Sequence, residues 1–249
     1  MCTIALLIDV VEVPLVIAAN RDEMYARDTG APRVLAPRVV GGIDLKSGGT
    51  WLALHARGFV AAVTNQRALA PPPEHVRSRG HVVRELAEAT DPDAYVAALD
   101  PRAYASMNLV WGDAEHVHVA YLRHDGDKEV HELPRGIHVL TNDRIGSPDF
   151  PRAAWIAGQI AAAPRDWPHL VPALQTILGD HRLHDAPAPP HLAPELARAL
   201  TATCIHTPRY GTRSSTIAGI DRSGVAHYLH ADGPPCTTPF HELGALLDA

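Results

Sequence analysis

The chain opens with Met1-Cys2-Thr3-Ile4-Ala5-Leu6-Leu7-Ile8, and a second apolar run, Pro14-Leu15-Val16-Ile17-Ala18-Ala19, leads into Asn20-Arg21-Asp22-Glu23. Both runs are rich in Ile, Leu and Val, which is typical of buried strands. If the two strands pair antiparallel, the end of the second lies beside the start of the first. Cys2 and the four polar residues are then neighbours. A carboxylate and a guanidinium come within reach of a thiol.

A cysteine in second position indicates a specific chemistry. Methionine aminopeptidase generally removes Met1 before a residue as small as Cys, which leaves a thiol and a free α-amine on Cys2. The amine has a pKa of about 7.7–8, so near neutrality it can take the proton of its own thiol. This is the arrangement of an N-terminal nucleophile. Alternatively, Cys2 is simply a small buried residue at the start of a strand. The polar cluster could likewise be a solvated turn.

Composition excludes several classes of protein. The 249 residues include 46% hydrophobic and 20% charged residues, which is typical of a globular protein, and we expect a single domain over residues 1–249. The net charge of −6 argues against a nucleic-acid partner. No apolar stretch approaches the roughly 18–20 residues that span a bilayer. Three cysteines and no room for a signal peptide predict a cytoplasmic protein without a disulfide framework. The oligomeric state cannot be predicted.

The sixteen histidines raise the question of a metal site. The close pairs lack the HExxH spacing, and no CxxC motif accompanies them. These pairs are His116 and His118, His181 and His184, and His227 and His230. Because the spacings do not match known metal-binding motifs, we expect neither a metal nor another cofactor.

The remaining pattern predicts hairpins and two blocks of helices. Strands are expected at residues 50–55, 58–64, 106–111, 116–123, 128–133, 136–143 and 225–230, and residues 209–221 are expected to be a loop that leads into a strand. Helices are expected at residues 81–89, 91–99, 151–163, 167–178, 192–200 and 241–247. Asp91 is the expected cap of the second helix, and the fourth is expected to start near Pro168 or Pro172. An irregular connection is expected after the first hairpin, and a loop at residues 68–74. Grouped hairpins and grouped helices indicate an α+β fold. The pattern is compatible with a four-layer αββα sandwich of two mainly antiparallel sheets flanked by helices.

The sequence blocks resemble a known family. Asn20-Arg21-Asp22-Glu23 is the motif after which the NRDE family, or transport and Golgi organisation protein 2 family, is named. The resemblance continues through Gly48–Leu52, Thr64–Arg67, Ser78–Gly80, Asn108-Leu109, Leu140–Asn142 and Tyr210–Thr216. The blocks follow in order along nearly the whole chain. The biochemistry of that family has been linked to lipid, acyl-coenzyme A and haem handling.

The same blocks are distantly similar to the bile-salt hydrolase and penicillin V acylase group of N-terminal cysteine hydrolases. The resemblance implies that Cys2 is the nucleophile and that Asp22 orients its amine and thiol. It implies that Asn65 and Asn142 are the oxyanion and substrate-polarising asparagines. The chain departs from that group at Ala19, where the group has an arginine three residues before the aspartate.

The resemblance therefore implies a hydrolase that acts on an amide or thioester of a small acylated substrate. Asn20, Arg21 and Arg213 are expected to bind the substrate. Arg21 or Arg213 would anchor an acidic part of it. Arg213 matches loosely a late active-site arginine of those N-terminal cysteine hydrolases. The alternative is a non-catalytic carrier of haem or an acyl lipid, in which Cys2 could be a soft ligand. A scaffold without a functioning site is a third possibility.

Overall fold

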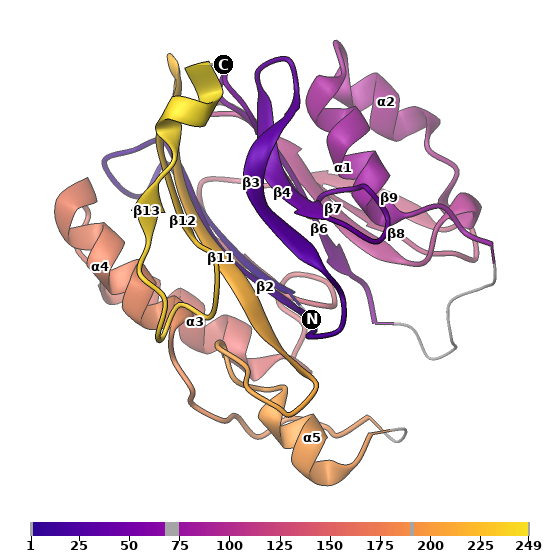
Figure 1. Ribbon diagram of the computed structural model, residues 1–249, viewed down its shortest axis with the longest axis vertical. Coiled ribbons are helices and arrows are strands. Elements are labelled where there is room, and N and C mark those ends of the chain that lie inside the picture. The colour runs from indigo at the N-terminus through magenta and orange to yellow at the C-terminus, as the bar shows by residue number, and fades with distance from the viewer. Residues whose placement is uncertain (1, 68–74, 190–191, 249) are drawn as a thin grey trace. The chain divides into compact units, whose positions relative to one another are not determined.

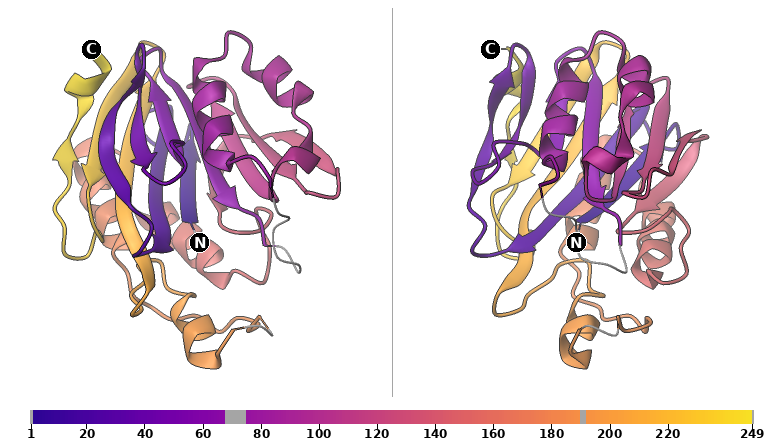
Figure 2. Two further views of the ribbon diagram at one scale, coloured as in Figure 1. Left: turned by 45° about the vertical axis from the view of Figure 1, so that its right-hand side comes forward. Right: turned by 90° about the vertical axis from the view of Figure 1, so that its right-hand side faces the viewer.

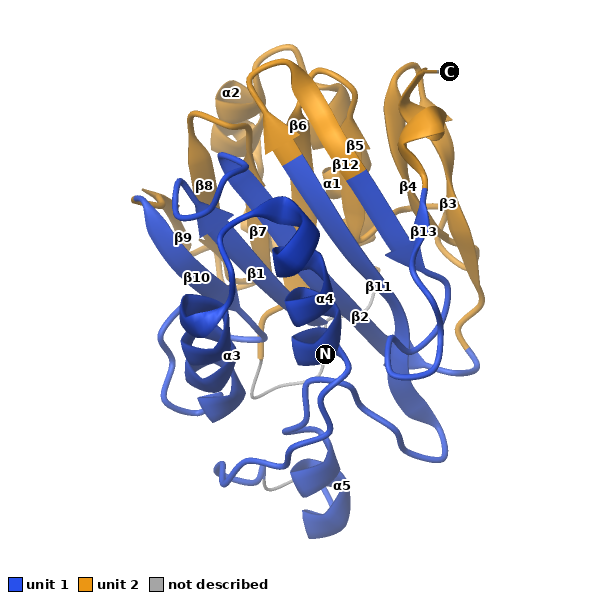
Figure 3. Ribbon diagram, turned by 90° about the vertical axis from the view of Figure 1, so that its left-hand side faces the viewer, with its two compact units in different colours: residues 1–26, 135–219, 228–242 blue, residues 27–134, 220–227, 243–249 orange. Residues whose placement is uncertain are grey.

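The computed structural model describes residues 2–67, 75–189 and 192–248, which form two compact units (Figure 3). Unit 1 comprises residues 1–26, 135–219 and 228–242, and unit 2 comprises residues 27–134, 220–227 and 243–249. The loop expected at residues 68–74 and the state of Met1 lie outside the described residues. The single domain over residues 1–249 stays a prediction.

Unit 1 is built on a six-stranded sheet. Its strand order is β10 (Gly136–Leu140), β1 (Cys2–Ile8), β2 (Leu15–Met24), β11 (Tyr210–Asp221), β12 (Gly224–Ala231) and β13 (His241–Glu242). The tip of the β11–β12 hairpin is grouped with unit 2. β1 pairs antiparallel with both β2 and β10, so the first strand of the chain lies inside the sheet.

Two helices cover one face of this sheet. α3 (Pro151–Ala162) packs on β10, and α4 (Trp167–Leu178) packs on β2 (Figure 3). Leu7 and Val16 face this layer, where they meet Ile156 and Leu174 in one buried cluster. α4 begins at Trp167, just before Pro168, the earlier of the two expected starts, because the Asp166 side chain caps it. A third helix, α5 (Pro194–Ala199), precedes β11.

Unit 2 contains a seven-stranded antiparallel sheet whose strands follow one another in chain order. They are β3 (Thr29–Ala36), β4 (Val39–Asp44), β5 (Leu52–His55), β6 (Phe59–Asn65), β7 (Met107–Gly112), β8 (Val117–Leu122) and β9 (Lys128–Glu132). α1 (Arg79–Glu88) and α2 (Pro92–Ala98), in magenta, lie against this sheet in Figures 1 and 2. The expected cap of α2 is confirmed, since the Asp91 side chain accepts from the Ala94 amide.

Two expectations about the elements were wrong. The segment after the first hairpin is not irregular, because β3 and β4 form a second hairpin. β3 is an edge strand with a poorly alternating, partly exposed sequence, and an edge tolerates Pro32. Residues 241–247 do not form one helix: β13 pairs with β12, and a short 3-10 helix follows at Gly244–Asp248.

The α+β class with two mainly antiparallel sheets is confirmed. Of the helices in the described residues, none has both the length and the hydropathy that crossing a membrane requires.

Candidate functional site

Cys2 lies at the start of β1, beside Arg21 of the predicted site. The β1–β2 register places it directly opposite Arg21, as the hairpin predicted. On the other side, β1 pairs with β10 through Ile4 and Leu140. β10 ends at Leu140, and Asn142 follows it in the connection to α3. Directly opposed residues on neighbouring strands have their Cα atoms about 4.5–5.5 Å apart.

The Asn-Arg-Asp-Glu motif lies within β2 and is not a polar cluster after the strand, which corrects the expectation. Asn20, Arg21 and Asp22 are 1%, 5% and 3% exposed. The motif stays in the strand because its backbone continues to pair with β1. Side chains alternate along a strand, so Arg21 lies on the face of Cys2 while Asn20 and Asp22 lie on the other face.

The Asp22 carboxylate is held by β11. Thr212 Oγ1 donates to Asp22 Oδ1 at 2.7 Å, and the Tyr210 hydroxyl donates to the Asp22 backbone carbonyl at 2.9 Å. Burial raises the pKa of Asp22 to about 6. The positive charges of Arg152 and Arg21 and the Thr212 hydrogen bond oppose that rise. Asp22 is thus a buried carboxylate that still ionises near neutral pH.

Arg152, in the first turn of α3, is a member of the site that the sequence did not reveal. Its side chain is 2% exposed, and Nη1 donates to the carbonyls of Leu200 at 2.6 Å and Ala202 at 3.2 Å. Its Nε and Nη2 are buried without a hydrogen-bond partner among the described residues. Its charge interacts with both Asp22 and Cys2.

A cation in the first turn of a helix is opposed by the helix dipole, so the helix itself does not favour Arg152 at this position. The sequence contained one signal. Arg152 precedes Ile156 and Ile160 by four and eight residues, which places it on the apolar face of α3. This buried guanidinium thus comes from a helix and not from β2, where Ala19 lies.

The Cys2 thiol is half-buried, and burial is the main cause that raises its pKa. The Asp22 carboxylate adds to the rise, while a backbone hydrogen bond from Asp22 and the charge of Arg21 oppose it. A thiol with a raised pKa is protonated at neutral pH. The cysteine therefore requires a base before it can act as a nucleophile.

Two residues expected to bind substrate make hydrogen bonds within unit 1. Asn20 Nδ2 donates to the carbonyls of Leu178 at 2.9 Å and Thr203 at 3.0 Å. Its Oδ1 accepts from Ser215 at 2.8 Å. Arg213 Nη1 donates to the carbonyl of Tyr25 at 2.8 Å. These contacts connect β2 to its surroundings, and binding of substrate by either side chain stays a prediction.

The two expected oxyanion asparagines belong to different units. Asn142 is 4% exposed and follows β10 in unit 1. Asn65 is exposed, ends β6 in unit 2 and pairs with Met107. The structure thus pairs Cys2 with Arg21 on neighbouring strands, describes Asn142 in unit 1 just after the strand that also pairs with β1, and describes Asn65 with the sheet of unit 2.

The chain is similar in structure to the Caenorhabditis elegans N-acylethanolamine-hydrolyzing acid amidase ortholog, with a TM-score of 0.53 and 11% identity over 87% of this chain and 92% of that one. At 11% identity this likeness shows the fold alone. The chain has an α+β fold like that of the N-terminal nucleophile hydrolases. In sequence, residues 1–232 match the family model of Transport and Golgi organisation 2.

Curated relatives agree with that match. The Bos taurus Transport and Golgi organization protein 2 homolog is 30% identical over 266 aligned positions, covering 92% of each chain. The Homo sapiens homolog is 29% identical over 239 positions, covering 84% of this chain and 83% of the relative. The chain belongs to the Transport and Golgi organisation 2 family. The family resemblance seen in the sequence is confirmed.

Proposed function

We propose that this chain is an N-terminal cysteine hydrolase that cleaves an amide or thioester bond of a small acylated substrate. The observation that carries the proposal is the position of Cys2 opposite Arg21 at the start of a central strand, with charge interactions to Asp22 and Arg152. The fold supports it, because N-terminal nucleophile hydrolases use the first residue of a buried strand in this way.

In the first step the α-amine of mature Cys2 takes the proton of the thiol, and Sγ attacks the substrate carbonyl carbon. The π electrons of the carbonyl move to its oxygen. The Asn142 amide donates a hydrogen bond to that oxyanion, and losing one such donor typically costs about 10²–10³ in rate. The resemblance assigns a second donor to Asn65.

The tetrahedral intermediate then collapses. The carbon–nitrogen or carbon–sulfur bond breaks, and the leaving amine or thiol takes the proton from the α-ammonium group. Water attacks the remaining acyl-cysteine and gives a proton to the amine. The carbon–sulfur bond to Cys2 breaks and the carboxylic acid leaves, so that the thiol and the free amine are restored.

Three charged residues support this reaction in the proposal: Asp22, Arg152 and Arg21. With a pKa of about 6, Asp22 is mostly ionised at pH 7 and can fix the α-ammonium group through a charge-assisted hydrogen bond. Arg152 is a positioning residue in this proposal, because its charge is one of the interactions that lower the pKa of Asp22 against the effect of burial. Arg21, which lies opposite Cys2, is the better placed of the two arginines to anchor an acidic group near the thiol.

The first experiment is the intact mass of untagged protein before and after brief treatment with iodoacetamide. We expect the loss of one methionine and a single rapid alkylation that peptide mapping assigns to Cys2. The same protein is then assayed on acyl anilides and acyl thioesters of graded chain length. Turnover should disappear in Cys2→Ala and fall strongly in Cys2→Ser, with the circular dichroism spectrum unchanged.

Full turnover by Cys2→Ala would reject the proposal. A retained Met1 would also contradict it, since the base on Cys2 would then be blocked. A shift of the haem Soret band on adding protein, smaller with Cys2→Ala, would favour the carrier function instead.

A further inference from the structure

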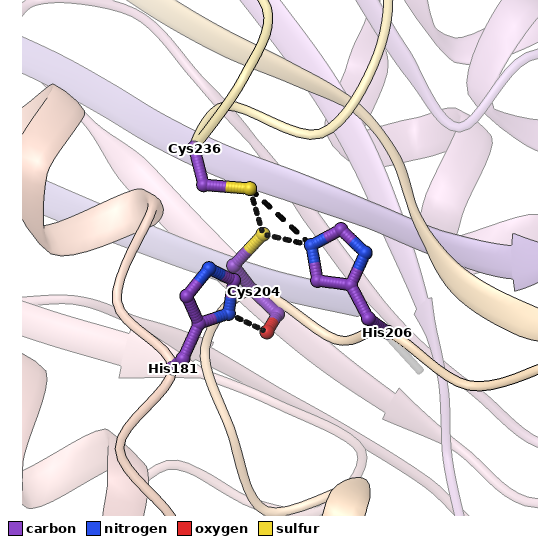
Figure 4. Close-up of side chains that lie close together, drawn as sticks. All are labelled: His181, Cys204, His206 and Cys236. Carbon is purple, nitrogen blue, oxygen red and sulfur yellow. Dashed lines mark hydrogen bonds between the residues drawn. The ribbon is translucent and has the colours of Figure 1, made fainter.

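Four side chains in unit 1, outside the candidate hydrolase site, converge from three separate segments. His181 follows α4, Cys204 and His206 precede β11, and Cys236 follows β12. Figure 4 shows the two thiols and the His206 ring turned toward one another, with the His181 ring beside Cys204. One nitrogen or sulfur atom from each residue lies within 4.8 Å of all the others.

The separations between the ligand atoms match a tetrahedral zinc centre. With Zn–S bonds of about 2.3 Å and Zn–N bonds of about 2.05 Å, tetrahedral geometry requires about 3.8 Å between two sulfurs and about 3.6 Å between sulfur and nitrogen. Cys204 Sγ and Cys236 Sγ are 3.7 Å apart. His206 Nε2 lies 3.6 Å from Cys204 Sγ and 3.3 Å from Cys236 Sγ.

The backbone around these residues holds the ligands in place. His181 Nδ1 is hydrogen-bonded to the Cys204 carbonyl at 3.0 Å, which leaves the Nε2 lone pair for a metal. Histidine ligands in proteins are usually oriented in this way by a partner on the other ring nitrogen. The Cys204 backbone amide donates to the Asp180 carbonyl at 2.8 Å, so the first two segments are joined without the metal.

Neither a disulfide nor a metal-free pair of thiols fits the cluster as well as a metal ion does. A disulfide requires about 2.05 Å between the sulfurs, far less than the observed separation. A metal ion instead accounts for two thiols and a histidine nitrogen that converge on one point, because coordinated thiols are deprotonated outright and then attract the cation.

We propose that His181, Cys204, His206 and Cys236 bind one Zn²⁺ ion in a tetrahedral Cys₂His₂ site. All four positions come from the protein, so the centre is structural and holds no substrate. Two soft thiolates with two imidazoles select zinc over magnesium or calcium. This departs from the expectation that the chain holds no metal, which considered only histidines close in sequence.

The zinc holds together segments that support the Asn-Arg-Asp-Glu motif. Asn20 bonds to the carbonyls of Leu178 and Thr203, which adjoin two of the three ligand segments. The Ile205 amide, between Cys204 and His206, donates to Thr212 Oγ1 at 2.9 Å. Loss of the metal should therefore loosen the surroundings of Asn20 and Asp22.

The test is the metal content of the full chain, purified without a histidine tag or chelator and measured by inductively coupled plasma mass spectrometry. We expect about one zinc per chain in the wild type and almost none in Cys204→Ser or Cys236→Ser. His184→Gln is the matched control, because this histidine lies three residues from His181 outside the cluster. It should retain about one zinc, as should Cys2→Ser, which separates this proposal from the hydrolase proposal.

A second measurement does not depend on the folding of any variant. Wild-type protein is stripped with a chelator and titrated with Co²⁺, which should give the visible bands of a tetrahedral cobalt–thiolate centre at one equivalent. Zn²⁺ should then displace the cobalt and restore the melting temperature. Folded wild-type protein that takes up neither ion would overturn the proposal. A Cys204–Cys236 disulfide in protein purified under reducing conditions would overturn it as well.

Discussion

The Thr212 hydroxyl donates a 2.7 Å hydrogen bond to Asp22 Oδ1 and accepts one of 2.9 Å from the Ile205 amide. All three groups are buried. One hydroxyl thus joins the candidate catalytic carboxylate on β2 to the segment that carries Cys204 and His206. We therefore expect a displacement of the Cys204–His206 segment to affect Asp22 through the Thr212 side chain.

Replacing Thr212 with valine tests that connection. The substitution leaves the Ile205 amide and one carboxylate oxygen without this partner, which should cost about 1–3 kcal/mol in the free energy of unfolding. Urea denaturation measures the loss. Thr212→Ser keeps the hydroxyl and should retain most of the stability, so an equal loss in both variants would argue against the hydrogen bonds as the cause.

The raised pKa of Asp22 predicts the pH dependence of stability. Its value of about 6 lies above that of an unfolded aspartate, so the folded chain binds the proton more tightly. The stabilisation from this proton is complete below about pH 4 and is lost as the pH rises through about 6. Relative to Asp22→Asn, the wild type should lose up to about 3 kcal/mol between about pH 4 and 7. Urea denaturation of both proteins across that range measures it, and parallel curves would contradict the assignment.

Arg152 should control the ionisation of Asp22. Arg152→Met removes the opposing charge, so the pKa of Asp22 should rise further and the pH at which stability is lost should move upward. It also leaves the carbonyls of Leu200 and Ala202 without their donor, at a cost of about 1–3 kcal/mol. Arg152→Lys keeps the charge and should keep the pH midpoint near that of the wild type. The pH dependence of stability separates the two variants.

Asn20 should contribute mainly to stability. Asn20→Ala removes two donors and one acceptor from a buried site and should destabilise the chain by roughly 2–4 kcal/mol. Ser215→Ala removes only the hydroxyl that bonds to Asn20 Oδ1 and should cost about 1 kcal/mol. Chemical denaturation of the pair checks this. A stable Asn20→Ala protein with a weakened substrate affinity would show that the residue binds substrate.

The sequence predicted the features that depend on local pattern. The register between Cys2 and Arg21 followed from two apolar runs and a hairpin, and the cap at Asp91 followed from a short motif. β3 was missed because none of its residues is fully buried, so it has no apolar face that would produce an alternating pattern.

The features that depend on tertiary contacts could not be predicted. Arg152 can be recognised as part of the site only in the folded chain, where α3 brings its charge near Asp22. The cluster of His181, Cys204, His206 and Cys236 spans three segments, so its spacing in the sequence contains no recognisable motif. For the same reason the burial of the Asn-Arg-Asp-Glu motif was not evident from its polarity.

The strand order has a consequence for synthesis on the ribosome. The seven strands of the unit 2 sheet lie between residues 29 and 132, so this sheet can assemble as soon as that stretch has emerged. β1 emerges first of all, yet it is flanked by β10, and β2 is flanked by β11, which begins only at residue 210. The nascent chain must therefore keep its earliest hairpin, with Cys2 at one end, without its second neighbouring strand until Tyr210–Asp221 has been translated.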